Sequence, residues 1–424
     1  MNLLHTLNPF CNPLVIKCAR ERLRLKNTLS WGIVVIVLAM FIYAISWKSA
    51  ERYLNDFGPM MQDSDAPFAG GNRAFPITTA DRAAEHTKLA GKFALASLVL
   101  MQRVILLLIG TGAVASGVAQ ERKGRVLDYQ RMTPMSPVSK IIGYLLGLPI
   151  REYFMFALIM PIVFFAALKA EVKLSNLVQL YLVGMVSVWL YHMTGMVAGM
   201  VSPKPWRASM ITQGMVILMY FIMPQLAGVG FTFFLYLTPR PVFARLASDE
   251  LGLNWGGIVN RDDWQDSVYF FDASIHPTTF TILVQGFLLV SMFVIVYRKW
   301  REESQHAFTK LYSVIFFTGA QLLLIGSLWP WLTEKAIDHS QRLRKAFGGA
   351  AGAGQGEGVM MLLLYIFFFV SLAVIVLLIN MITPSRYTFA KGIRSSRKRQ
   401  LSRVPWLSDG ASAVPYTLIF VILT

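Results

Sequence analysis

The sequence predicts an all-α polytopic membrane protein, and three observations carry this prediction. Hydrophobic residues make up 55% of the 424 residues, charged residues only 15%, and the mean hydropathy is +0.51. Soluble domains carry about 25% charged residues. Long apolar runs recur along the chain, and the excess of basic residues collects in alternate loops. An ordinary soluble protein is therefore excluded.

The apolar runs predict eight complete membrane spans, since a helix needs roughly 20 apolar residues to cross about 30 Å of hydrocarbon. These runs are residues 28–46, 93–119, 141–168, 174–201, 209–229, 278–297, 312–332 and 359–383. A ninth run begins at Val414 and is too short to cross before Thr424. We expect either a half-span there or a chain that continues beyond Thr424.

The loops between these runs predict a cytoplasmic N-terminus. With the N-terminus inside, the inner segments hold 23 Lys and Arg against 6 acids, and the outer segments hold 15 against 16. Lys and Arg accumulate on the cytoplasmic side of membrane proteins. The net charge of +17 is therefore a topology signal that argues against nucleic acid as a partner. We expect a multi-pass protein of the inner or plasma membrane.

The segments outside the spans have their own signatures. The basic segment 1–27 precedes span one without a cleavage site, so that span reads as a retained anchor. Its Cys11 and Cys18 are interpreted as reduced thiols without a structural role. Turn signals predict an irregular outer cap over 47–92, an acidic and aromatic outer loop spans 230–277, and the tract Gly348–Gly358 predicts a flexible linker.

No motif for catalysis occurs along the chain. A Walker A loop, His-Glu-x-x-His and Gly-x-Ser-x-Gly are all missing from the sequence. The sequence therefore predicts no catalytic residues, no metal ligands and no cofactor on this chain.

The inner loop 121–137 carries the most information. Leu127 and Arg131 are four residues apart, with Val126 and Met132 nearby, which favours a short amphipathic helix. Thr133-Pro134 ends that helix, and Ser136-Pro137 is typical of a helix start. Such a helix is a part that another protein can push; a plain connector between two spans is an equally weighted alternative.

This loop resembles the coupling segment of ABC-2 type transporter permeases. Glu121-Arg122 ends the second span, Leu127-Asp128 follows, and Thr133-Pro134-Met135-Ser136-Pro137 enters the third. The N-terminal stretches 12–17 and 20–24 are similar to the interfacial helix of that family, and Tyr297–Glu302 is similar to the end of its sixth span. The resemblance covers residues 10–303. Two departures are Lys123, where the family has an acid, and Arg125, where it has glycine.

The resemblance implies an architecture and partners. Residues 1–27 would form a cytoplasmic interfacial helix, 28–303 a six-span core, and 304–424 an additional region with spans seven, eight and part of a ninth. Two permease units, identical or different, would pair and be driven by separate ATPase subunits that bind ATP and Mg. The residues implied to couple to the ATPase are Glu121, Arg122, Gly124, Leu127, Asp128, Thr133 and Pro134.

Four polar residues inside the spans are further candidates, because such residues are costly in a bilayer. They are Arg103, Arg151, Glu152 and His192. Arg103 and Glu152 lie at similar depth, about 27 and 22 Å from the coupling loop at 1.5 Å per residue. We favour a structural ion pair between them over substrate contact or snorkelling. His192 is interpreted as a hydrogen-bonded buried residue beside Gly195 and Gly199, which permit close helix packing.

The sequence thus predicts the membrane subunit of an ATP-driven exporter, with a lipid-like or amphipathic substrate favoured over an ion. The alternative is a membrane scaffold or assembly subunit without transport activity, which binds anionic lipid or a partner through the basic tail 386–403. An ion-coupled carrier is a weaker alternative, because it needs more ionisable residues in the spans.

Overall fold

The computed structural model describes residues 12–64, 79–229, 232–249, 268–302, 305–332 and 355–424, and they are mostly helical. Eight helices within these ranges are long and apolar enough to cross a membrane, as the sequence predicts. Six spans each lie in a single helix: Thr28–Asn55 in α3 (Leu25–Ser64), α8 (Ile150–Lys169), α9 (Leu174–Val201), α12 (Pro277–Arg301), Lys310–Pro330 in α13 (Lys310–Leu332) and Leu364–Ile382 in α15 (Gln355–Ile382). The span Arg82–Lys123 runs through α4 (Thr79–Arg103), η2 (Val104–Gly110) and α5 (Thr111–Lys123). The span Pro205–Leu226 runs through α10 (Pro205–Ile217), η3 (Leu218–Ile222) and η4 (Met223–Val229).

The irregular cap predicted over 47–92 is wrong for the described part of that segment. Helix α3 continues to Ser64 and α4 begins at Thr79, so the first two spans extend into a helical hairpin. The Arg82 guanidinium donates to Asn55 Oδ1 at 3.0 Å, and the rings of Trp47 and His86 meet edge to face. These contacts between the two helices stabilise the helical conformation beyond the apolar runs.

The third predicted span is also corrected. The run 141–168 divides into α7 (Pro137–Gly147) and α8, and only α8 is long enough to cross. The break falls at Pro149, which lacks the backbone N–H that a continuous helix needs. Helix α7 packs against α2 (Pro13–Arg22) instead of continuing the span.

Close packing of α5 and α9 holds the centre of the bundle together. A Cβ atom on Gly195 would lie 2.9 Å from the Thr111 carbonyl oxygen, and one on Gly199 would lie 2.6 Å from that of Ala115. The predicted close approach at these two glycines is confirmed, because any side chain there would force the helices apart.

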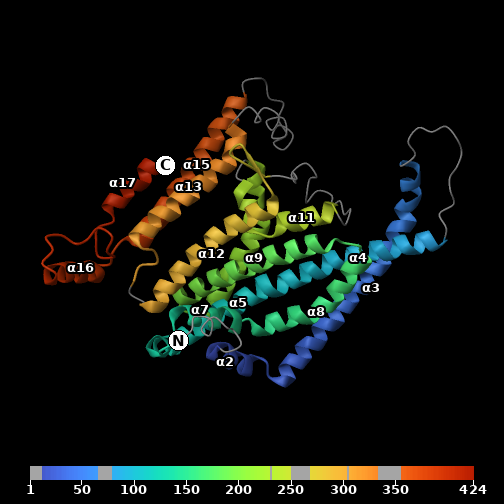
Figure 1. Ribbon diagram of the computed structural model, residues 1–424, viewed down its shortest axis with the longest axis horizontal. Coiled ribbons are helices and arrows are strands. Elements are labelled where there is room, and N and C mark those ends of the chain that lie inside the picture. The colour runs from blue at the N-terminus through green and yellow to red at the C-terminus, as the bar shows by residue number, and fades with distance from the viewer. Residues whose placement is uncertain (1–11, 65–78, 230–231, 250–267, 303–304, 333–354) are drawn as a thin grey trace.

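Short elements cover the two ends of the bundle (Figure 1). One end carries η5 (Thr232–Leu237), α11 (Arg240–Asp249) and an antiparallel hairpin of β1 (Val268–Phe270) and β2 (Ala273–Ile275), in which Val268 pairs with Ile275. The hairpin is a small departure from the predicted all-α class. The opposite end carries α2, α6 (Val126–Met132), α7 and α16 (Arg386–Lys398).

The C-terminal region packs onto α12 through an apolar cluster. Ile295 of α12 meets Phe317 of α13, Leu378 of α15 and Phe420 of α17 (Val414–Leu423) in this cluster. Most of the predicted linker Gly348–Gly358 lies outside the described residues, and its last four residues begin α15. The additional spans are thus continuous with the core rather than a separate body.

Candidate functional site

The loop after α5 folds into the short helix that the sequence predicts. Gly124 ends α5, Arg125 takes a left-handed conformation with φ of 56°, and α6 follows. Thr133 is the extended residue that ends α6. The Ser136 hydroxyl then accepts a hydrogen bond from the Ser139 N–H at 3.1 Å and caps α7, as predicted.

Three contacts fix α6 to its surroundings. Leu127 is buried in an apolar cluster that includes residues of α2, α5, α7, α9 and α12. The Lys140 ammonium of α7 donates to the carbonyl oxygens of Gln130 and, at 3.2 Å, Thr133, so it caps the end of α6. Arg131 pairs with Asp128 at 2.7 Å and donates to the Lys299 carbonyl oxygen at 3.3 Å. Helix α6 is therefore linked to both α7 and the end of α12.

Glu121 faces the interior of this end of the bundle. Its carboxylate accepts from the Tyr144 hydroxyl and pairs with the Lys17 ammonium at 3.4 Å, and only 17% of its side chain is exposed. Neighbouring Arg122 is also partly buried. Glu121 is accordingly placed to hold α2 and α7 on α5.

Several residues of this segment are exposed, and we call them together the α6 surface. Tyr129 and Met132 are 72% and 75% exposed and form its apolar part. The other exposed residues of this segment are Lys123, Gly124, Arg125, Asp128, Thr133 and Pro134. Sequence reasoning placed Met132 with Leu127. Counting 100° per residue instead puts Tyr129 and Met132 opposite Leu127, which is the signal that identifies them.

Helix α2 packs closely on α7 through the side-chain amide of Asn12 and two glycines of α7. Asn12 Oδ1 accepts from the Leu14 N–H at 3.0 Å, and Asn12 Nδ2 donates to the Ser139 carbonyl oxygen at 2.7 Å. A Cβ atom on Gly143 would lie 2.7 Å from Leu14 Cβ, and one on Gly147 3.1 Å from Cys18 Cβ. Burial raises the pKa of the Cys18 thiol, which keeps it protonated and unreactive. Cys11 lies outside the described residues.

The predicted ion pair between Arg103 and Glu152 is wrong. Glu152 is fully buried and pairs with the adjacent Arg151 at 2.8 Å. Arg103 instead donates to the Leu180 carbonyl oxygen at 2.9 Å, and its guanidinium carbon lies 6.0 Å from the centre of the Tyr181 ring. The two residues lie at similar depth in the membrane, but their side chains do not point toward each other, because depth does not fix the direction of a side chain around its helix.

The prediction of a hydrogen-bonded buried histidine at position 192 is confirmed. His192 is fully buried, with Nε2 3.1 Å from the Leu106 carbonyl oxygen and Nδ1 3.3 Å from the Tyr153 hydroxyl. Both ring nitrogens therefore have partners. Across the part of the chain that the structure describes, no group of three His, Cys, Asp or Glu side chains is arranged to hold a metal ion.

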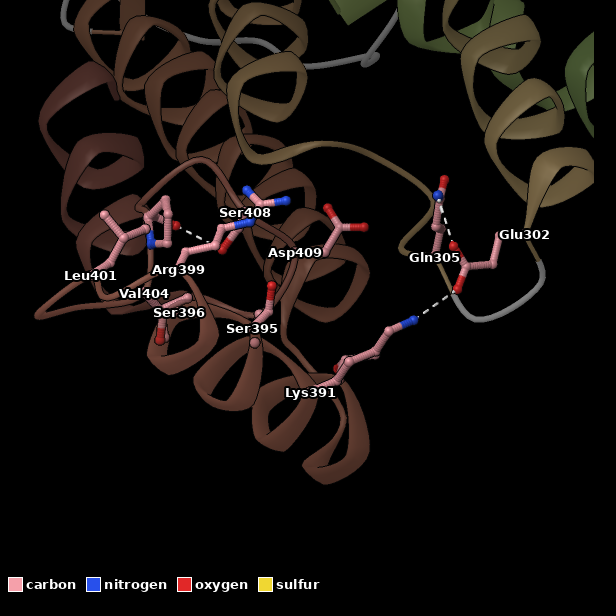
Figure 2. Close-up of a pocket in the computed structure, with 14 residues that line it drawn as sticks. Glu302, Gln305, Lys391, Ser395, Ser396, Arg399, Leu401, Val404, Ser408 and Asp409 are labelled. Atoms are coloured by element: carbon pink, nitrogen blue, oxygen red, sulfur yellow. Dashed lines mark hydrogen bonds and ion pairs between the residues drawn. The ribbon is translucent and has the colours of Figure 1, made fainter.

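A hollow of about 220 Å³ lies where the end of α12 meets α16 (Figure 2). Three of the charged residues that line it are paired: Lys391 with Glu302 at 3.3 Å, and Asp409 with Arg298, outside the lining, at 2.6 Å. The fourth, Arg399, forms no ion pair among the described residues. This hollow is a joint between the core and the C-terminal region.

Comparisons with protein-family models, with curated proteins and with solved structures found no match to the chain. Any function therefore has to be argued from the residues and their arrangement.

Proposed function

We propose that the chain is the membrane-spanning permease subunit of an ABC-2 type exporter, driven by separate ATPase subunits that bind ATP and Mg. The observation that carries the proposal is α6, a short helix that is fixed to several spans and exposes Tyr129 and Met132. Clustered, exposed aromatic and methionine side chains are typical of protein contact sites. The resemblance of 121–137 to a coupling segment supports the same function.

The contacts of α6 offer a route for force from an ATPase into the spans. A push on α6 would reach α12 through the hydrogen bond from Arg131 to Lys299, and α7 through Lys140. Leu127 would carry it into the apolar cluster shared with α5 and α9. ATP-driven closure of two ATPases would then tilt the core 28–303. This mechanism requires the end with α2 and α6 to face the cytoplasm of an inner or plasma membrane.

The test is co-purification from the native membrane. The wild-type protein, solubilised in mild detergent, should bring down an ATPase with a Walker A motif, and the double variant Tyr129→Ser/Met132→Ser should lose it. These two side chains are suited to the test because both are exposed and their loss leaves the contacts of Glu121, Arg131 and Lys140 in place.

A matched control is Tyr387→Ser on α16, where the tyrosine is 69% exposed. This variant should retain the ATPase. Retention by the double variant would contradict docking on the α6 surface. Failure of every protein, wild type included, to capture an ATPase would contradict the exporter and move the scaffold alternative forward.

A further inference from the structure

Arg103 carries a positive charge inside a span, and no acidic side chain among the described residues neutralises that charge. Its one hydrogen bond within the described residues goes to a neutral carbonyl, that of Leu180, and no acidic side chain there forms an ion pair with it. A guanidinium has five N–H donors. An uncompensated charge in hydrocarbon costs several kcal/mol, which makes such a residue a functional candidate.

A second unsatisfied polar group lies on the neighbouring span. The Tyr220 hydroxyl is buried and has no hydrogen-bond partner among the described residues, and its side chain packs against the cluster with Leu106 and Leu107 of η2, the helix that begins directly after Arg103. Buried hydroxyls in native proteins nearly always have a partner. A guanidinium and an unpaired hydroxyl donor together are the groups that bind a phosphate or a carboxylate.

The backbone around these two groups is unusual in three places. Gly184 leaves room for the guanidinium, since a Cβ atom there would lie 1.5 Å from Arg103 Nη1. The π-helix η2 begins directly after Arg103, and the π-helix η3 contains Tyr220. π-Helical turns are rare and occur frequently at functional sites.

The surroundings suit an amphiphile rather than a free ion. Leu100 and Val104 flank Arg103 and are 50% and 45% exposed, and Phe221, next to Tyr220, is 69% exposed. Leu180 and Tyr220 each lie six residues from the end of their span on the side of α11, about 9 Å at 1.5 Å per residue. An anionic head at this depth would leave its apolar tail beside lipid-facing side chains.

We propose that Arg103 and Tyr220 bind the anionic head, a phosphate or carboxylate, of an amphiphilic substrate from between α4, α9 and η3. This substrate class rests on the proposed transport function. The binding itself requires no ATPase, so it can be measured separately.

The experiment is calorimetric titration of the full-length protein, purified in a neutral detergent, with decyl phosphate and decanoate. Decyl glucoside supplies the same tail without charge, and inorganic phosphate supplies the charge without a tail. The two anionic amphiphiles should bind, and both controls should bind at least about tenfold more weakly, which is the loss expected for one hydrogen bond to a charged group.

Arg103→Gln should weaken decyl phosphate binding about tenfold or more, because it removes the charge that the head requires. Tyr220→Phe is the variant for which misfolding is not expected: its hydroxyl has no partner to lose, so thermal stability should hold while affinity falls. Arg207→Gln, at the other end of the span that contains Tyr220, is the matched control and should bind as the wild type does.

Wild-type affinity in Tyr220→Phe, or equally tight binding of decyl glucoside, would overturn the assignment. Equally tight binding of inorganic phosphate would overturn the amphiphile as the ligand. Selective binding by a protein that captures no ATPase would uphold this site while contradicting the exporter. The two proposals therefore fail separately.

Discussion

Asn12 shows how much a single side chain contributes at the end of the bundle with α2. Its amide oxygen caps α2 at Leu14, and its amide nitrogen donates to Ser139 of α7, with the residue 3% exposed. Asn12→Ala should destabilise the protein by about 1 to 2 kcal/mol, because both a helix cap and a buried hydrogen bond are lost. Thermal unfolding in detergent measures this as a lower Tm.

Asn12→Asp tests the amide donor while keeping the acceptor that caps α2. A carboxylate still accepts from the Leu14 N–H, but it has no donor for the Ser139 carbonyl oxygen. We expect its Tm to lie at or below that of Asn12→Ala, because the second carboxylate oxygen would face the Ser139 carbonyl oxygen, acceptor against acceptor, at a buried position. Asn380→Ala, at an exposed asparagine of α15, is the matched control and should leave Tm unchanged. Equal Tm for all four proteins would show that the amide does not hold α2 on α7.

At the residue scale, local patterns were predictable and contacts between elements were not. Ser136 and Pro137 start a helix by their own chemistry, and Gly195 and Gly199 show their role by spacing. The partner of Glu152 was misassigned because depth along a helix says nothing about rotation around it. Arg151 has its guanidinium on the Glu152 carboxylate, which no count of residues reveals.

At the scale of elements, apolar length alone misjudged the stretch 141–168. Its residues are apolar enough for one long span, yet α7 ends at Gly147 and its apolar face packs on α2. The buried side of α7 is covered by a segment more than 100 residues earlier in the chain, so a sequence window could not show it. The outward face of α6 differs, because counting 100° per residue from buried Leu127 already places Tyr129 and Met132 on the opposite side.

The connection between α12 and α13 contains a pH-sensitive residue, His306. Burial lowers its pKa below the ordinary 6.5, and the charges of Lys310 and Lys299 act in the same direction, against Asp409. The folded state therefore favours neutral His306, while the unfolded chain takes up a proton near pH 6.5. Its contribution to stability is fully present above that pH and is lost as the pH falls below it.

We expect Tm to fall between pH 7.5 and pH 5.5 by more in the wild type than in His306→Gln. Glutamine removes the titrating group and leaves the backbone carbonyl of residue 306, which accepts from Arg298 at 2.9 Å. Thermal unfolding of both proteins at the two pH values checks this. An equal fall in both would show that His306 does not contribute to the acid sensitivity.

At the scale of the whole molecule, the number of spans and the charge asymmetry were readable from the sequence, because both depend on composition over long windows. The attachment of the C-terminal region was not. Lys310 donates to the carbonyl oxygens of Ala411 and, at 3.2 Å, Ser412, and Arg298 pairs with Asp409, so α12 and α13 both hold the segment that precedes α17. These partners lie about a hundred residues apart.

The orientation of the molecule gives the last prediction. Lys123 at the end of α5 and Lys398 at the end of α16 are exposed, and six of the eight spans lie between them, so both should face the cytoplasm. Ser274 in the hairpin should face outward. In a Cys11→Ser background, where Cys18 is buried, Ser274→Cys should react with a membrane-impermeant thiol reagent in intact cells. Lys123→Cys and Lys398→Cys should react only after permeabilisation. The reverse pattern would place the α6 surface outside the cell, where a cytoplasmic ATPase cannot reach it. Labelling of the two lysine positions from opposite sides of the membrane would contradict the even number of spans between them.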